Sequence, residues 1–146
     1  MIESSDSKPK TPIWHYVVIA GAVVVGVMMV AVLSQASWQL SAAKKAFHAY
    51  ASALVAKNYS EAYQLTTQSF RATRDYNTFT ETFQGLTTEM GDLKRVNVNR
   101  IDVNEYSDGW FGTADADLVF DHGDLHLSFT LKKENGAWKV YRYREQ

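Results

Sequence analysis

The chain has 146 residues, with 15 Lys and Arg against 16 Asp and Glu, a formal net charge of −1 and no cysteine. The mixed charge argues against the clustered basic surface of a nucleic-acid-binding protein. The lack of cysteine excludes disulfides and thiolate metal sites but does not identify the compartment.

A short polar tail precedes a long uncharged stretch. Residues 1–10 are polar and predict a disordered tail. Residues 11–43 contain no Lys, Arg, Asp or Glu, and residues 13–33 within them are almost wholly apolar. A helix of about 20 apolar residues crosses the hydrocarbon core of a bilayer and satisfies its own backbone hydrogen bonds there. The sequence therefore predicts a transmembrane signal-anchor helix at residues 11–38.

A cleaved signal peptide is the alternative interpretation of the same stretch. Ser34-Gln35-Ala36 roughly fits the small-x-small rule for cleavage. The apolar run is, however, longer than the ~7–15 residues of a usual signal core. No Gly or Pro lies between Met28 and Ser34 to end the helix before the cleavage site. We therefore favour a retained anchor.

The flanking charges favour one orientation in the membrane. Lys8 and Lys10 precede the apolar segment closely, whereas Lys44 and Lys45 follow about ten residues after it. By the positive-inside rule, the N-terminus is expected in the cytoplasm of a bacterium with the anchor in its inner membrane. Residues 39–146 then form a periplasmic or otherwise extracytoplasmic domain. Trp14 and Tyr16 at one end and Trp38 at the other are the expected membrane-interface anchors.

The first part of the remaining chain shows helical spacing. Residues 41–57 predict an amphipathic helix, continuous with the membrane helix because no Gly or Pro intervenes. Ser60 is a suitable N-cap for a short second helix that ends near Thr67. Asp75 or Thr73 is expected to cap a third helix, which ends by Gly91. The apolar positions that define the first and third helices are Leu40, Phe47, Tyr50, Ala51, Leu54, Phe79, Phe83 and Leu86.

After Gly91 the apolar residues alternate, which predicts four strands. The first covers residues 93–103, and its apolar parity slips, so we expect a β-bulge near Asn99-Arg100. The dipeptide Asn135-Gly136 is the strongest hairpin turn signal in the chain. The other strands are expected at residues 110–120, 125–131 and 138–144.

One register brings small residues opposite large ones. Pairing Phe120 with Leu125 would place Ala116 opposite Phe129, as an interdigitated core requires. On this pairing, the fold class is α+β: a transmembrane helix, then three helices packed on a bent four-stranded antiparallel sheet.

Two local patterns carry a resemblance to a known superfamily. The run KNYSEAYQL from Lys57 to Leu65 follows a long helix, and the run NGAWKV from Asn135 to Val140 leads into the last strand. This layout resembles the nuclear-transport-factor-2-like (cystatin-like) superfamily and covers residues 41–146. The resemblance implies a cone-shaped fold, and the superfamily holds isomerases, dehydratases, ligand binders and assembly domains.

The anchor followed by a cone is similar to small bacterial envelope proteins. More loosely, it is similar to the inner-membrane scaffold subunits of type IV secretion systems. These two resemblances imply an interaction role.

The titratable residues of the sheet give no catalytic pair. An enzyme of this fold would place a carboxylate or a histidine inside the cone, where burial raises a carboxyl pKa. Asp115, Asp117 and His126 alternate with apolar positions and are expected to face outward. His122 lies in a polar turn that matches no calcium-loop spacing. We therefore expect no catalytic residue, no metal site and no cofactor.

Two residues are candidates for ligand binding. His48 lies at the edge of the apolar stripe of its helix. Arg142 falls on the buried side opposite Phe129 if Asn135-Gly136 forms a two-residue turn, and there it would bind an anion. Alternatively, Arg142 reaches the rim, pairs with an acidic residue, or lies elsewhere because a register shift turns Tyr141 and Tyr143 inward.

The leading functional hypothesis is a non-catalytic, membrane-anchored envelope interaction or assembly module. Phe111, Val119, Tyr141 and Tyr143 have outward parity and are the expected interaction surface. The expected partners are further copies of the chain or other envelope proteins, of which a secretion-system complex is one specific form. The alternative is a small-ligand binder or an isomerase- or dehydratase-like enzyme that uses the cone pocket.

Overall fold

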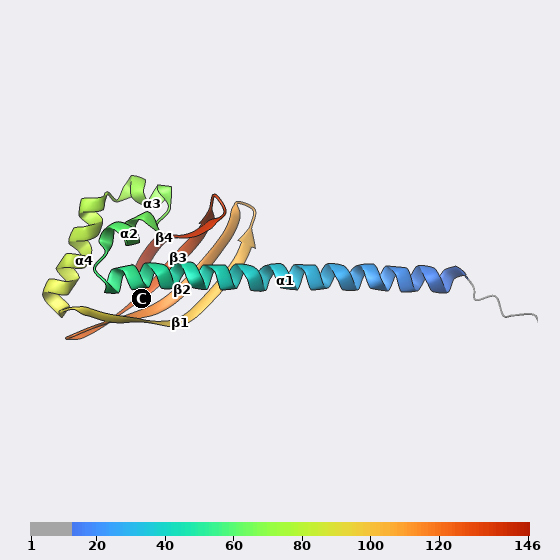
Figure 1. Ribbon diagram of the computed structural model, residues 1–146, viewed down its shortest axis with the longest axis horizontal. Helices are drawn as coiled ribbons and strands as arrows, with labels where there is room; N and C mark the ends of the chain where they lie inside the picture. Colours follow the sequence, from blue (N-terminus) through green and yellow to red (C-terminus); the bar gives the residue numbers. More distant parts are fainter. Residues whose placement is uncertain (1–12) are drawn as a thin grey trace, which may run out of the picture. The chain divides into compact units, whose positions relative to one another are not determined.

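The computed structural model describes residues 13–146, without the side chains of residues 13–16, 32 and 33 (Figure 1). The predicted tail at residues 1–10 and the side chains of Trp14 and Tyr16 lie outside the described part. The chain divides into two compact units, Met1–Gln35 and Ala36–Gln146. Its elements are α1 (Ile13–Val55), α2 (Tyr59–Gln64), α3 (Gln68–Thr73), α4 (Tyr76–Met90), β1 (Leu93–Tyr106), β2 (Gly109–Phe120), β3 (Gly123–Glu134) and β4 (Ala137–Glu145).

The first unit contains the apolar part of α1. Among the described residues, this helix is the one long and apolar enough to cross a membrane, a criterion that a signal sequence also meets. Its large apolar side chains are exposed, for example Val17 at 66% and Val30 at 68%, unlike those of a core helix in a soluble protein. Trp38, on the same helix, is 74% exposed.

Side-chain caps define the shorter helices of the second unit. Asn58 caps α2 by accepting a hydrogen bond from the Glu61 backbone N–H, so the predicted cap at Ser60 is wrong by two residues. Thr67 caps α3, a helix that the sequence analysis did not predict, and Asp75 caps α4 as expected. Gly91 ends α4 with φ 83°, where a Cβ atom would lie 2.5 Å from Asp121 Cβ.

The strands form one antiparallel sheet in the order β1-β2-β3-β4. The expected β-bulge is confirmed, because the β1–β2 register shifts between Val98 and Arg100. The register of β2 with β3 differs from the predicted one: Phe120 pairs with Gly123 instead of Leu125. The chain reverses within two residues there, not four, and the resulting shift of two positions leaves every side chain on its predicted face.

A second bulge, in β4, changes which side chains face the core. Leu131 pairs with Val140 but Thr130 pairs with Arg142, so Tyr141 is the extra residue. The prediction that Arg142 faces inward is therefore wrong, and so is the outward orientation of Tyr143. Arg142 is exposed, and Tyr143 lies opposite Phe129 on the inner side.

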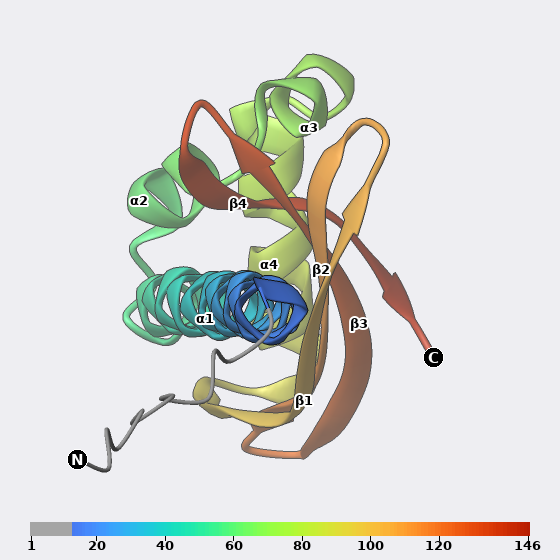
Figure 2. The same cartoon turned by 90° about the vertical axis from the view of Figure 1, so that its right-hand side faces the viewer.

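The core lies between the helices and one face of the sheet. Figure 2 shows α1, α2 and α4 on the same side of the curved sheet. Within the second unit, α1 contributes Phe47, Tyr50 and Leu54, which are almost completely buried. The Phe47 and Phe129 rings lie 5.0 Å apart between their centroids. The small residues Ala114 and Ala116 of β2 are completely buried and leave room for these rings.

The Phe47 contact predicts a large loss of stability on truncation. Phe47→Ala should lower the free energy of unfolding by about 3–5 kcal/mol, because it removes a buried ring and leaves a cavity. Urea denaturation of the full chain in detergent, followed by tryptophan fluorescence, measures this. The exposed neighbour Lys45→Ala should stay within about 0.5 kcal/mol of the unchanged protein. Equal unfolding midpoints for the two variants would contradict the packing of α1 on the sheet.

Candidate interaction surface

The side of the sheet that faces away from the helices carries most of its polar side chains, with the aromatic residues Tyr106, Phe111 and Tyr141, and we call it the outer face. The pairing register of the strands decides which residues are neighbours on this face. One row joins Asp102, Thr113, Thr130 and Arg142, the next joins Arg100, Asp115, Ser128 and Arg144, and a third joins Asn97, Asp117 and His126. The outer face therefore presents both signs of charge together with hydroxyl groups.

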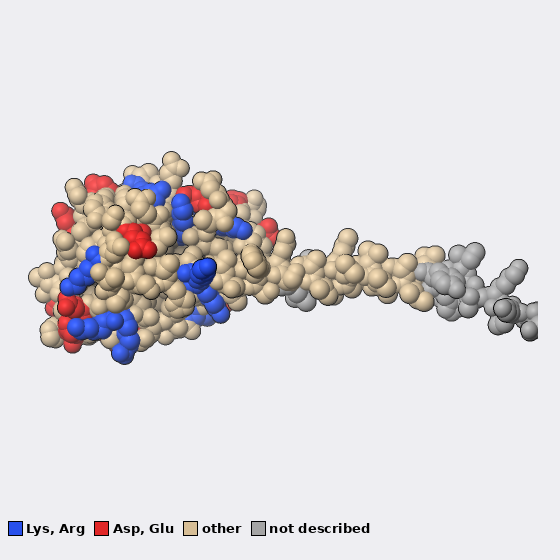
Figure 3. All heavy atoms as spheres, in the orientation of Figure 1, with Lys and Arg blue, Asp and Glu red and all other residues tan. Residues whose placement is uncertain are grey.

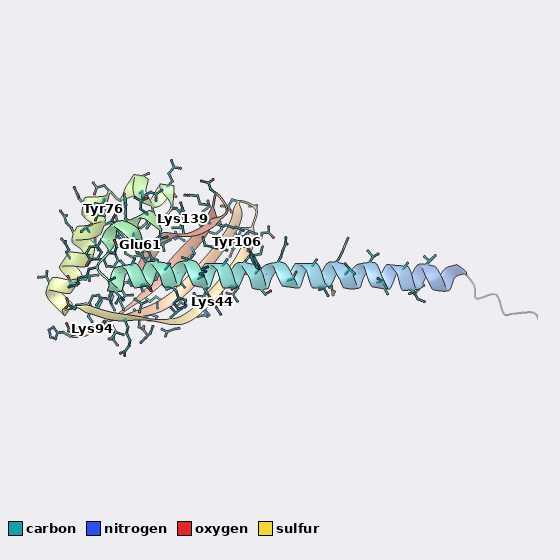
Figure 4. All side chains as sticks on the ribbon, viewed as in Figure 1. Lys44, Glu61, Tyr76, Lys94, Tyr106 and Lys139 are labelled. Carbon is teal, nitrogen blue, oxygen red and sulfur yellow. The ribbon has the colours of Figure 1, made fainter. Side chains whose placement is uncertain are left out.

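A hollow of about 380 Å³ lies on this face. It is lined by residues of all four strands, among them Tyr106, Phe111, Thr130, Arg142 and Arg144. Figure 4 labels Tyr106, which lies at the end of the β1–β2 hairpin. The Arg142 Nε–H donates to the Thr130 hydroxyl at 3.4 Å. The hollow thus combines two guanidinium groups, hydroxyls and aromatic rings, the chemistry of a polar protein-binding surface.

Aromatic rings and cationic side chains contact each other at the hollow. We call this group the Phe111 cluster: Tyr106, Phe111, Lys132, Tyr141 and Arg142. Phe111 meets Tyr106 and Tyr141 edge-on, at centroid distances of 5.8 and 6.2 Å. The Lys132 ammonium lies 5.0 Å from the centroid of the Phe111 ring, and the Arg142 guanidinium lies 5.9 Å from that of Tyr141. Such cation–π contacts hold long cationic side chains in place. The structure thus brings together three residues that the sequence singled out: Phe111, Tyr141 and Arg142.

The other predicted site residues lie elsewhere. Val119 is on the outer face but pairs with Arg95 and Asp124, several rows from Phe111. His48 is exposed on α1. Tyr143 is packed against Phe70, Phe83 and Phe129 inside the fold, with centroid distances of 5.8 to 6.2 Å.

A histidine–carboxylate pair lies on the outer face in the row of Asn97, Asp117 and His126. His126 Nδ1 pairs with Asp117, which also accepts a hydrogen bond from Asn99 at 3.0 Å. His126 Nε2 lies 2.9 Å from the side-chain oxygen of Gln146. The Ser128 hydroxyl donates to Asp115 and not to His126, so these residues do not form a nucleophile with its base. Their contacts hold the last strand and Gln146 against the sheet.

The interior of the fold is filled with aromatic rings. Tyr50 and Phe129 lie 5.9 Å apart, and Phe79 and Phe83 lie 5.1 Å apart, between ring centroids. The Tyr50 hydroxyl is buried and has no hydrogen-bond partner among the described residues. Arg74, which the sequence analysis did not single out, donates to the Tyr143 hydroxyl. Burial raises the pKa of Tyr143, although Arg74 opposes this shift, so the phenol is neutral at ordinary pH.

The fold places the chain among α+β proteins, and its likeness to solved structures rests on the fold alone. No protein-family model matches the chain, and no curated protein matches it in sequence. A SEC-C motif containing protein, RPA3114 from Rhodopseudomonas palustris, is 17% identical with a TM-score of 0.50, over 65% of this chain and 71% of that one. Aln2 from a Streptomyces species is 8% identical with a TM-score of 0.53, over 73% of this chain and 88% of that one. Bd1075 from Bdellovibrio bacteriovorus is 10% identical with a TM-score of 0.54, and its match covers 70% of this chain but only 38% of that one.

The His126–Asp117 pair predicts a pH dependence. The hydrogen bond that His126 donates to Asp117 raises the pKa of His126 above its usual 6.5, so this contribution to stability is complete below about pH 6.5 and is lost as the pH rises through the raised pKa. The hydrogen bonds from His126 and Asn99 lower the pKa of Asp117 below its usual 3.8, so its contribution is lost as the pH falls through the lowered pKa. The pair therefore stabilises the fold most between about pH 4 and pH 6.5.

An NMR titration of His126 tests this pair. Asp117→Asn should bring the pKa of His126 down towards 6.5, because the main partner of the imidazolium loses its charge. Asp124→Asn removes a carboxylate from the same face without touching this pair and should leave the titration unchanged. If His126 has the same pKa in both variants, Asp117 does not stabilise the protonated form of His126.

Proposed function

We propose that the protein is a non-catalytic interaction module, anchored by α1 in the inner membrane of a bacterium with its domain outside the cytoplasm. The exposed apolar side chains of α1 from Val17 to Val30 support the anchor. Lys8 and Lys10 before that segment support a cytoplasmic N-terminus. A resemblance to the cone-shaped nuclear-transport-factor-2-like domains remains part of the proposal, as does membership of a larger envelope assembly such as a secretion system.

The observation that carries this function is the Phe111 cluster on the outer face. Tyr, Phe and Arg are enriched at the centres of protein interfaces, since each buries a large area and Tyr and Arg also keep a polar group that can hydrogen-bond. Here the rings of Phe111 and Tyr141 are ordered by each other and by Lys132. Less conformational entropy is then lost when a partner covers them. The partner is a second copy of the chain or another envelope protein.

The filled interior favours binding through the surface over catalysis in a pocket. Phe47, Tyr50 and Phe129 occupy the space between α1 and the sheet where an enzyme of this shape would hold its substrate. Tyr143, brought inward by the bulge in β4, closes the space further between Phe83 and Phe129.

A double substitution tests the proposed surface. Phe111→Ala with Tyr141→Ala should weaken self-association or co-purification of the full chain in mild detergent by about tenfold or more, because truncation of central aromatic residues typically costs about 1–2 kcal/mol or more. Tyr76→Ala, which removes an exposed ring from α4, is the matched control and should have no effect.

Size-exclusion chromatography with light scattering and quantitative mass spectrometry of bound proteins give the readout. Assemblies that survive the double substitution, or that are lost equally with Tyr76→Ala, would refute the outer face as the binding surface.

A further inference from the structure

The two edges of the sheet differ in how they are covered. At the β4 edge, the Thr67 N–H donates to the Val140 carbonyl and the Val140 N–H donates to the Leu65 carbonyl, both at 2.9 Å. The connection between α2 and α3 therefore occupies that edge. Among the described residues, β1 pairs with β2 and with no other strand, although it is 14 residues long. An edge strand of this kind offers a row of free backbone donors and acceptors.

Hollows follow the free edge of β1, which we call the β1 edge. Three of them, of about 330, 490 and 410 Å³, are lined on one side by residues 94–104 of β1 and on the other by residues 36–56 of α1. All these residues belong to the second unit. Figure 2 shows β1 beside α1, and Figure 4 labels Lys44 and Lys94, one from each element. Open space therefore adjoins residues 94–104 of β1 on the side of α1.

The two sides of the β1 edge have different chemistry. On the inner side, the half-buried Val96 and Val98 lie across the hollows from Ala51 and His48 of α1, and the polar residues Lys44, Asn97 and Asn99 line the same space. A strand added here would place every second side chain against this lining.

On the outer side, the edge is basic. Arg95 is exposed and takes part in no ion pair among the described residues. Lys44 of α1 takes part in none either, but it lines a hollow from the inner side. Lys94 reaches Asp121 at 3.1 Å, and Arg100 reaches Asp102 at 3.0 Å. Figure 3 shows Lys and Arg side chains on this side of the domain, with Asp or Glu side chains next to some of them. The uncompensated charge attracts carboxylates.

We propose that an extended acidic segment of a partner protein adds to the sheet along residues 95–98 of β1, between the two register shifts of this strand. Its backbone pairs with the free groups of the strand, which supplies affinity without sequence preference. Its carboxylates, at every second position, lie beside Arg95, and its alternate small apolar side chains contact Val96 and Val98. The β-bulge between Val98 and Arg100 ends the pairing. This site is separate from the Phe111 cluster and does not depend on the function proposed for it.

The charge of the edge distinguishes this occupant from a second copy of β1. A second copy would add a further Arg95 to an edge where Arg95 already lacks an acidic partner among the described residues, and it would bring no carboxylate to either. An acidic segment meets Arg95 with opposite charge.

Fluorescence anisotropy with the full chain in detergent micelles tests the site. The probe is a labelled Val-Asp-Val-Asp-Val-Asp peptide, and the control is the same peptide with Lys in place of Asp. The acidic peptide should bind and the basic one should not. Arg95→Glu should weaken binding about five- to tenfold, as loss and reversal of an exposed charge pair would. Lys139→Glu, the same charge change on β4 and outside both proposed surfaces, should leave it unchanged.

Backbone pairing is tested on the unmodified protein with two N-methylated probes. One carries methyl groups on the Val amides and the other on the Asp amides. Strand addition uses the amides of one set, so one probe should lose binding and the other should retain it. Equal binding by both probes, equal binding of the acidic and basic peptides, or no effect of Arg95→Glu would overturn the proposal. A change of oligomeric state in Arg95→Glu without peptide binding would also overturn it, since the edge would then serve a second copy.

Discussion

Packing of α1 against the sheet is the contact on which the rest of the domain depends. Phe47, Tyr50 and Leu54 of this helix are almost completely buried, and two of their rings meet Phe129 of β3. A four-stranded antiparallel sheet needs such a cover, because one of its faces is otherwise apolar and open to water. The same helix carries the uncharged segment at its other end. The uncharged segment and the buried residues of α1 thus belong to one continuous helix.

Aromatic side chains fill the interior of the domain, so the candidate sites lie on its surface. Tyr143 exemplifies this, since the bulge in β4 places its ring between Phe83 and Phe129 instead of in solvent. The same bulge turns Arg142 outward, where it joins Phe111 and the hollow of the outer face. One irregularity therefore both closes the core and supplies a cation to the candidate interaction surface. The β1 edge is a second proposed surface, independent of the Phe111 cluster.

The sequence predicts the faces of the strands better than their pairing. Alternation places Ala114 and Ala116 in the core, since the pleat leaves no other choice. The pairing of Phe120 with Gly123 could not be foreseen, because a shift by two positions preserves the faces and only the turn length decides between the registers. Alternation could not predict the bulge in β4, because Tyr141 and Tyr143 can each lie on either face of the sheet. Among the candidate interaction residues, Phe111 and Tyr141 were found by outward parity, whereas Lys132 enters only through contacts across the sheet.

The mature form of the chain in bacterial membranes tests most directly whether α1 is both anchor and core helix. Since the chain has no native cysteine, Ser107→Cys and Ser5→Cys can be labelled separately in intact cells with a membrane-impermeant maleimide, and the intact mass then gives the N-terminus. The account predicts a protein of full length, extracted only by detergent, that is labelled at position 107 and not at position 5. A water-soluble protein that begins near Ser37, or labelling at position 5 alone, would contradict it.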